Sequence, residues 1–309
     1  MDKKALKSNA ALLLTAIIWG LAFVAQSDGM NYIGPFTFGA VRCMMGAIVL
    51  VPVYLIIQKK NGTLHDEKEN QKRKRTLKAG LLCGVAFFAA TSTQQIGLQY
   101  TSAGKAGFVT ALYIVLVPVF GMIFFKKRAG LKTWISVAAA TVGLYFLCIT
   151  DGFSIGVGDI WVIACAVIFT FHILLIDKFA DSIDGTLLSI IQFALASVLS
   201  VPFLIITKEQ FSLQTLSNAW VSLAYTGVLS CGVGYTLQIV GQRDAKNPTV
   251  ASLLMSMESV FAVIFGWLIL DERLTQREFA GVILMSAAIV LSQLPIGEKK
   301  SKEKTSEKA

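Results

Sequence analysis

Ten apolar stretches divide the chain, and they constrain its fold more than any other feature. Each runs for 16 to 24 residues, and the charged residues gather in short clusters between them. A helix rises 1.5 Å per residue, so about 20 residues cross a hydrocarbon core of roughly 30 Å. Only 15% of the residues are charged, against roughly 25% in a soluble domain. The sequence therefore predicts an all-α integral membrane protein. The expected spans are residues 10–27, 34–57, 77–98, 104–125, 131–149, 157–176, 187–207, 219–240, 249–270 and 277–294.

Lysine and arginine fall mostly on one side of this expected topology. With a cytoplasmic N-terminus, 23 of them lie on the inner side, four lie on the outer side, and Arg42 lies inside a span. Cytoplasmic loops of membrane proteins carry such an excess of Lys and Arg. We therefore predict a multi-pass protein of the cell (inner) membrane with both termini in the cytoplasm. The net charge of +9 follows from this topology. We expect no nucleic-acid partner, whereas the inner basic loops are expected to contact anionic lipids.

The two halves of the chain resemble each other. A shift of 150 positions superposes Val51-Pro52 on Val201-Pro202, and a shift of 144 superposes Gln94 on Gln238. Each half holds five spans, and an odd number forces the second half to enter the membrane in the opposite sense. Inverted repeats of this kind are typical of secondary transporters, whose binding sites lie near the bilayer midplane.

The duplication predicts the organisation of the whole chain. Residues 1–150 are expected to form a first five-helix repeat, and residues 151–296 a second, inverted five-helix repeat. Residues 297–309 are rich in lysine and predict a disordered basic cytoplasmic tail. The two repeats are expected to enclose a central cavity.

Short motifs follow one another in a characteristic order between residues 10 and 294. They are Trp19-Gly20, Pro35 with Arg42, Gly97-Leu-Gln-Tyr-Thr-Ser-Ala103, Tyr113 with Pro118, Gly158-Asp159, and Glu258 followed by Asp271-Glu272-Arg273-Leu274-Thr275. With these motifs in this order, the chain resembles the EamA-like branch of the drug/metabolite transporter superfamily. One departure is that family members often have Glu-Pro where this chain has Glu258-Ser259. The proline-dependent kink of the family is therefore not carried over to this position.

The resemblance implies a ten-helix secondary active transporter of a small metabolite, such as an amino acid, an amine or a related compound. It further implies alternating access of the two inverted repeats, with export as the expected direction. The fifth and tenth spans are peripheral in this family, and we expect either a monomer or a homodimer that pairs through them. The alternative function is a lipid or lipid-precursor flippase on the same scaffold.

Two ionisable side chains are predicted to lie deep in the membrane. Arg42 lies about 12 Å below the outer end of its span, and Glu258 about 18 Å below the outer end of its own. A charge at mid-helix costs at least ~2.5–3.5 kcal/mol. We expect both side chains to face a wet cavity as substrate-binding or proton-coupling groups. The alternative is a structural role, either as an ion pair or with Arg42 capping carbonyls of a neighbouring helix.

Aromatic side chains at the same depth are further candidates. Trp19 and Tyr113 each lie about 14 Å into their spans, and Phe169 occupies the position equivalent to Trp19. Tyrosine and tryptophan favour the membrane interface, so at mid-membrane each is expected to find a polar partner. These residues predict a cavity wall that could hold an amine by cation–π contact. Ordinary helix packing is the alternative.

Buried amides and a histidine complete the candidate pathway. Gln94 and Gln95 lie near the outer end of the third span, and Gln238 lies near the inner end of the eighth. Their opposite depths suit gate contacts in an inverted repeat, although solvation at the interface is the alternative. His172, in the sixth span, could titrate near neutral pH and couple transport to protons. The alternative is a histidine satisfied by hydrogen bonds.

The sequence offers no enzymatic motif. Six residues separate Gly97 from Gly104 where a phosphate-binding loop needs four, and Gly156-Val-Gly-Asp159 has no second buried aspartate to form a protease dyad. The five cysteines show no paired spacing. We predict that the protein is not an enzyme and needs neither cofactor nor metal, so transport is expected to draw on a gradient of ion or substrate.

Overall fold

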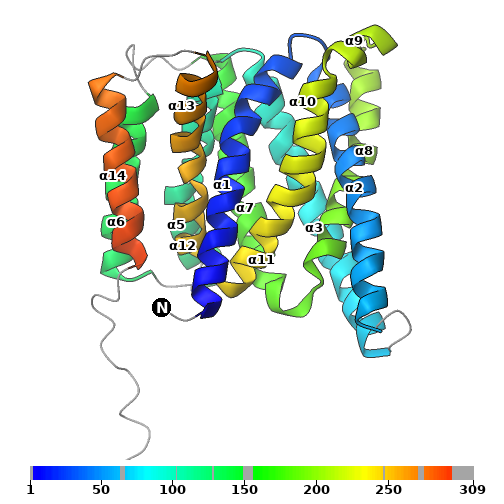
Figure 1. The fold of residues 1–309 in the computed structure, drawn as a ribbon, viewed down its shortest axis with the longest axis horizontal. Coiled ribbons are helices and arrows are strands. Elements are labelled where there is room, and N and C mark those ends of the chain that lie inside the picture. Colours follow the sequence, from blue (N-terminus) through cyan, green and yellow to red (C-terminus); the bar gives the residue numbers. More distant parts are fainter. Residues whose placement is uncertain are drawn as a thin grey trace, which may run out of the picture.

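The structure is a computed structural model, and it shows a bundle of helices (Figure 1). It describes residues 3–62, 67–101, 103–126, 129–148, 156–245, 248–270 and 275–293. The predicted tail at 297–309 lies outside these residues. The elements are α1 (Lys3–Gly29), α2 (Pro35–Lys60), α3 (Glu67–Leu98), α4 (Ala103–Thr110), α5 (Tyr113–Phe125), α6 (Leu131–Cys148), α7 (Val157–Phe179), η1 (Ala180–Ser182), α8 (Gly185–Ile206), α9 (Leu213–Asn218), α10 (Trp220–Ala224), η2 (Tyr225–Tyr235), α11 (Thr236–Asp244), α12 (Pro248–Met255), α13 (Met257–Leu270) and α14 (Gln276–Gln293).

The prediction of an all-α membrane protein is confirmed. Six helices of the described chain are long and apolar enough to cross a membrane, and four more apolar helices are shorter. Together they match the ten predicted spans. The eighth span is one continuous helical segment made of α10, η2 and α11, and its middle part, η2, is π-helical. The short helix α9 before it was not predicted.

Two of the predicted spans are not continuous helices. Span 104–125 is divided into α4 and α5 by a turn at Ala111 and Leu112, and span 249–270 is divided into α12 and α13 at Ser256. At the first break, backbone hydrogen bonds join residues three positions apart instead of four, as between the Ile114 N–H and the Ala111 carbonyl at 3.0 Å. At the second, the Ser256 hydroxyl donates to the Leu253 carbonyl at 2.8 Å, and such a bond bends a helix.

The two breaks are equivalent positions in the two halves. The shift of 144 that relates Gln94 to Gln238 also relates Leu112 to Ser256. The second break therefore forms at the symmetry-related place although no proline follows Glu258. Discontinuous helices at mid-membrane are characteristic of transporter binding sites.

Helices of each half pack mainly against helices of the other half. The long helix α3 packs along α7 and α8, while its counterpart, the α10–η2–α11 segment, packs along α1 and α2. Helices α2 and α8 pack against each other, as do α6 and α14, which lie together at one edge of the bundle (Figure 1). This pattern is what an inverted duplication produces. Pairing of subunits through α6 and α14 stays a prediction.

Both ends of the described chain lie at the same edge of the bundle. Figure 1 shows the start of α1 and the end of α14 at this edge, together with the start of α8. We call this edge the termini side and the opposite edge, where α9 lies, the far side. Because α2 runs from the far side to the termini side and α8 runs back, the two helices are antiparallel.

The bundle has the polarity expected of a protein in lipid. Large apolar side chains on its outside are exposed, including Ile48 at 61%, Ile56 at 66% and Ile206 at 72%. Arg42 and Glu258, by contrast, are each only 3% exposed. Lipid can solvate apolar side chains but not charges. The charged and polar groups within the membrane therefore need partners inside the bundle.

Side chains at or just beyond the C-terminal ends of α2 and α8 form hydrogen bonds at the N-terminus of the other helix. On the far side, the Glu209 carboxylate follows α8 and accepts the backbone N–H groups of Phe36 and Thr37 at 3.0 and 2.7 Å. On the termini side, the Gln58 amide of α2 donates to Asp184, the residue that caps α8, at 3.3 Å. Both contacts place an acceptor at a helix N-terminus, which the helix dipole favours.

Gly20 gives a test of the close contact between α1 and α13. A Cβ at Gly20 would lie 2.9 Å from the Ala262 backbone nitrogen and 2.9 Å from the Glu258 carbonyl oxygen. We predict that Gly20→Ala lowers the free energy of unfolding by about 1–3 kcal/mol, because α1 and α13 must move apart. The measurement is the unfolding midpoint of the purified protein in detergent.

Gly39→Ala is the matched control within α2. A Cβ there would meet only the Ser200 hydroxyl, at 3.5 Å. We expect this variant to be as stable as the wild type or more stable by up to about 1 kcal/mol, since alanine favours the helix. Equal stability of Gly20→Ala and wild type would contradict the close contact.

Candidate functional site

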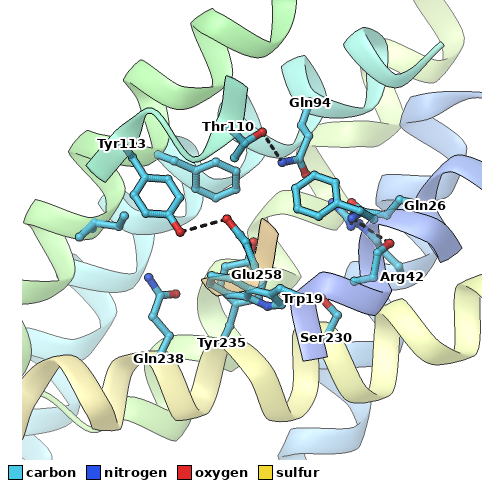
Figure 2. A pocket seen from close by; sticks show the side chains of 14 residues that line it. Trp19, Gln26, Arg42, Gln94, Thr110, Tyr113, Ser230, Tyr235, Gln238 and Glu258 are labelled. Atoms are coloured by element: carbon cyan, nitrogen blue, oxygen red, sulfur yellow. Dashed lines mark hydrogen bonds between the residues drawn. The ribbon is translucent and has the colours of Figure 1, made fainter. Parts of the chain in front are cut away.

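A narrow cavity of about 30 Å³ lies between the two halves, and Figure 2 shows its lining. Helices α1, α2, α3, α4, α5, α7, α11 and α13 and the π-helical η2 contribute side chains to it. Most of these side chains are buried. The lining residues are Trp19, Ala22, Phe23, Gln26, Arg42, Gln94, Thr110, Tyr113, Phe169, Ile173, Ser230, Tyr235, Gln238 and Glu258.

One wall of the cavity carries a positive charge. Arg42 donates from Nη1 to the Gln26 Oε1 at 2.6 Å, and its guanidinium carbon lies 5.6 Å from the centre of the Phe38 ring. Its Nε has no hydrogen-bond partner among the described residues. A guanidinium has five N–H donors, and both Gln26 and Phe38, which it contacts here, are neutral. The group is therefore suited to bind an anion.

A carboxylate faces the cavity from a different wall. The Tyr113 hydroxyl donates to the Glu258 Oε1 at 3.0 Å, and both side chains are 3% exposed. Tyr113 is the first residue of α5, and Glu258 is the second residue of α13. The bond thus joins the two equivalent helix breaks, one from each half. The breaks place both groups at the centre of the bundle.

Arg42 and Glu258 have separate partners in this structure. Figure 2 shows Arg42 beside Gln26 and Glu258 beside Tyr113, within one cavity. The interpretation of a structural ion pair does not describe this arrangement, and neither does that of a carbonyl cap, because Arg42 donates to a side-chain amide. The cavity presents a guanidinium group and a carboxyl group at different places.

The expectation of a polar partner for each deep aromatic residue is right for Tyr113 and wrong for Trp19. The Trp19 Nε1 has no hydrogen-bond partner within the described part of the chain. Its ring packs on Tyr235 with the ring centres 4.5 Å apart. Trp19 and Phe169 both line the cavity, as their equivalent positions predict. The indole N–H is a donor that a substrate could use.

Of the amide and histidine candidates, some line the cavity and others do not. Gln94 lines the cavity and donates to the Thr110 hydroxyl at 3.2 Å, and Gln238 lines it as well. Gln95 and His172 are not among the lining residues. Gln95 donates to the Met30 sulfur at 3.4 Å, and the roles predicted for it and for His172 stay untested.

Several lining residues were not predicted. Tyr235 lies deep in its span, so the depth argument that selected Trp19 could have found it. Thr110 lies three residues before Tyr113, so on the continuous helix that the sequence predicts the two would share a face. Ser230 gives no such signal, because small polar residues are common at ordinary helix contacts.

Comparisons with known proteins assign a family. A model described as the EamA-like transporter family matches residues 6–149 and again residues 156–294. An uncharacterized transporter of Archaeoglobus fulgidus is 29% identical over 293 residues, covering 95% of this chain and 88% of its own length. The uncharacterized transporter YoaV of Bacillus subtilis is 22% identical, covering 95% and 99%. A chloroplastic WAT1-related protein of Arabidopsis thaliana is 26% identical, covering 93% and 69%.

A solved crystal structure has the same fold. It superposes with a TM-score of 0.74 at 14% sequence identity, and the match covers 93% of this chain and 96% of the other. The similarity supports the arrangement of the whole described bundle, including the helices that form the cavity.

Tyr113→Phe tests the bond across the cavity. We predict a loss of about 0.6–1.7 kcal/mol in the free energy of unfolding, the range for interhelical hydrogen bonds in membranes. The measurement is thermal unfolding in detergent. Tyr145→Phe on α6 is the control, because Tyr145 is 43% exposed at the bundle surface. Equal effects of the two substitutions would show that the Tyr113 hydroxyl contributes nothing specific.

Proposed function

Because the chain belongs to the EamA-like transporter family, and is thus a membrane transporter, we propose that it carries a small zwitterionic metabolite of the amino-acid class. We further propose secondary active transport by alternating access of the two halves. Export stays the expected direction, and assays in both directions test it.

The placement of Arg42 and Glu258 in one cavity carries this proposal. Guanidinium N–H groups bind carboxylates, so Arg42 with its neutral partner Gln26 suits the anionic end of a substrate. Glu258 accepts from the uncharged Tyr113 and suits an ammonium group. The rings of Trp19 and Tyr235 lie between the helices that carry these charges and could face a cation. An amino acid carries both charges a few atoms apart.

The architecture supports alternating access. Two halves of opposite orientation meet at the cavity, and each contributes one helix that is broken at the equivalent position. Transporters with such repeats move one half against the other around a central site. The Tyr113–Glu258 bond crosses between the halves, so a movement that separates α5 from α13 must break it.

Glu258 is also our candidate for proton coupling. A proton and an ammonium group would compete for the same carboxylate, so binding of one would release the other. Such competition links substrate movement to a proton gradient without any nucleotide. Arg42 cannot take this role, because arginine stays protonated in proteins.

Matched substitutions test the two ends of the site. We predict that Arg42→Gln raises the KM for an amino acid roughly 10- to 150-fold, the effect of losing a charged hydrogen bond of about 1.5–3 kcal/mol. The KM for the corresponding decarboxylated amine should not change. Glu258→Gln should also raise the KM for the amino acid and should abolish the dependence of uptake on a pH gradient. The measurement is uptake by proteoliposomes over a panel of labelled amino acids and amines.

Arg75→Gln and Glu69→Gln are the charge-matched controls, since Arg75 is exposed and Glu69 lies near the start of α3, away from the cavity. Both should transport normally. Full activity of Arg42→Gln and Glu258→Gln would refute the proposed site. Phospholipid movement in the same vesicles, without amino-acid uptake, would favour the flippase.

The sidedness of the protein gives a separate prediction. We propose that the termini side faces the cytoplasm of the cell (inner) membrane, because 23 Lys and Arg residues belong to that side in the ten-span topology. Green fluorescent protein fused after residue 309 should fluoresce, and alkaline phosphatase fused there should be inactive. The reverse result would invert the assignment, along with the contact of basic loops with anionic lipids.

A further inference from the structure

A second buried polar pair lies outside the central cavity. His172 of α7 and Gln192 of α8 are fully buried, and the His172 Nε2 lies 3.0 Å from the Gln192 Oε1. Neither residue is among those that line the cavity. Gln192 carries none of the roles considered above, so the pair requires its own explanation.

Each side chain of the pair leaves one polar atom without a hydrogen bond. The His172 Nδ1 and the Gln192 Nε2 have no hydrogen-bond partner among the residues that the structure describes. A buried polar atom without a partner destabilises the folded state. Two such atoms on neighbouring side chains are available to bind a polar ligand.

The chemistry of the two free atoms defines that ligand. The Gln192 Oε1 can only accept, so the His172 Nε2 donates to it and leaves Nδ1 as an acceptor. The free Gln192 amide nitrogen offers N–H donors. The pair therefore presents an acceptor and donors side by side. An ammonium group fits the first and a carboxylate fits the second.

The duplication relates this pair to the Arg42 wall of the cavity. Arg42 lies seven residues after Pro35, the first residue of α2, and Gln192 lies seven residues after Gly185, the first residue of α8. Each bonds to the first helix of its own half, Arg42 to Gln26 and Gln192 to His172. Since α2 and α8 are antiparallel, the Arg42 pair lies toward the far side and the Gln192 pair toward the termini side.

Aromatic rings separate the pair from the cavity. The ring centres of Phe169 and Tyr235, which line the cavity, lie 6.1 and 6.3 Å from the centre of the His172 ring. The Phe87 ring lies 5.8 Å away. A change in the side-chain rotamers of Tyr235 and Phe169 would connect the two polar regions.

We propose that His172 and Gln192 form a second subsite for the zwitterionic substrate, which is reached when the cavity opens toward the termini side. In this arrangement the Arg42 pair holds the substrate in the far-side half of the path, and the His172 pair holds it in the termini-side half. The identity of the ligand rests on the proposed function, whereas the opening of the subsite to water does not.

Thiol labelling tests that opening directly. Gln192→Cys is made in a chain whose five cysteines are replaced by alanine, and the purified protein is placed in lipid nanodiscs that leave both faces open to solution. The probe is a water-soluble methanethiosulfonate with a quaternary ammonium group. We expect Gln192→Cys to react at least tenfold faster than the control Ala140→Cys. Ala140 is also fully buried, but it lies on α6 in an apolar cluster. Equal rates would overturn the subsite.

Transport by Gln192→Leu gives a second measurement, with the native cysteines in place. The probe is the labelled amino acid that the wild type carries best, measured in right-side-out and inside-out vesicles. We expect the KM from the termini side to rise about tenfold, with the KM from the far side within twofold of wild type. A rise that is equal from both sides, or no rise, would overturn the proposal.

The two measurements separate this inference from the proposed function. If the wild type carries no amino acid, the transport proposal fails, and the labelling rates still decide whether the subsite opens. If transport is found and Gln192→Cys labels no faster than Ala140→Cys, the proposed function survives and the subsite is rejected.

Discussion

A carboxylate at the centre of a membrane bundle needs a hydrogen-bond donor from another helix, and the bond from Tyr113 to Glu258 meets this need between the two halves. Each residue stands where a membrane helix is interrupted, and the interruptions occupy equivalent positions. The interruptions place short helix starts beside the cavity, where polar backbone can be tolerated because it does not face lipid. This contact joins the two halves at the central cavity.

Most of the fold could be predicted from the sequence, because the bilayer makes the length and polarity of each span a strong constraint. The ten apolar stretches and their order reappear in the structure. The interruptions at Leu112 and Ser256 could not be predicted, since neither carries a glycine or proline and the chain has Glu258-Ser259 where relatives often have a proline. At Ser256 the bend arises from hydroxyl groups that bond to their own helix, and serine does this only in some contexts. Hydropathy does not predict the π-helical stretch of η2 either.

The candidate site was predictable where depth and charge identify a residue. Arg42, Glu258, Trp19, Tyr113 and Phe169 stand out because polar or aromatic groups are costly or unusual at mid-membrane, and all of them line the cavity. Depth does not reveal which way a side chain points. His172 and Gln95 therefore lie at suitable depths without lining the cavity, while Tyr235 closes one wall through a ring contact that only the packing of η2 against α1 creates.

The contact at Gly20 fixes two walls of the cavity relative to each other. Helices α1 and α13 approach there until the backbone of one would touch a methyl group on the other, and interiors packed this densely resist sliding. Trp19 on α1 and Glu258 on α13 are thus held at a fixed separation although they belong to different repeats, so any movement that opens the cavity has to carry these two helices together.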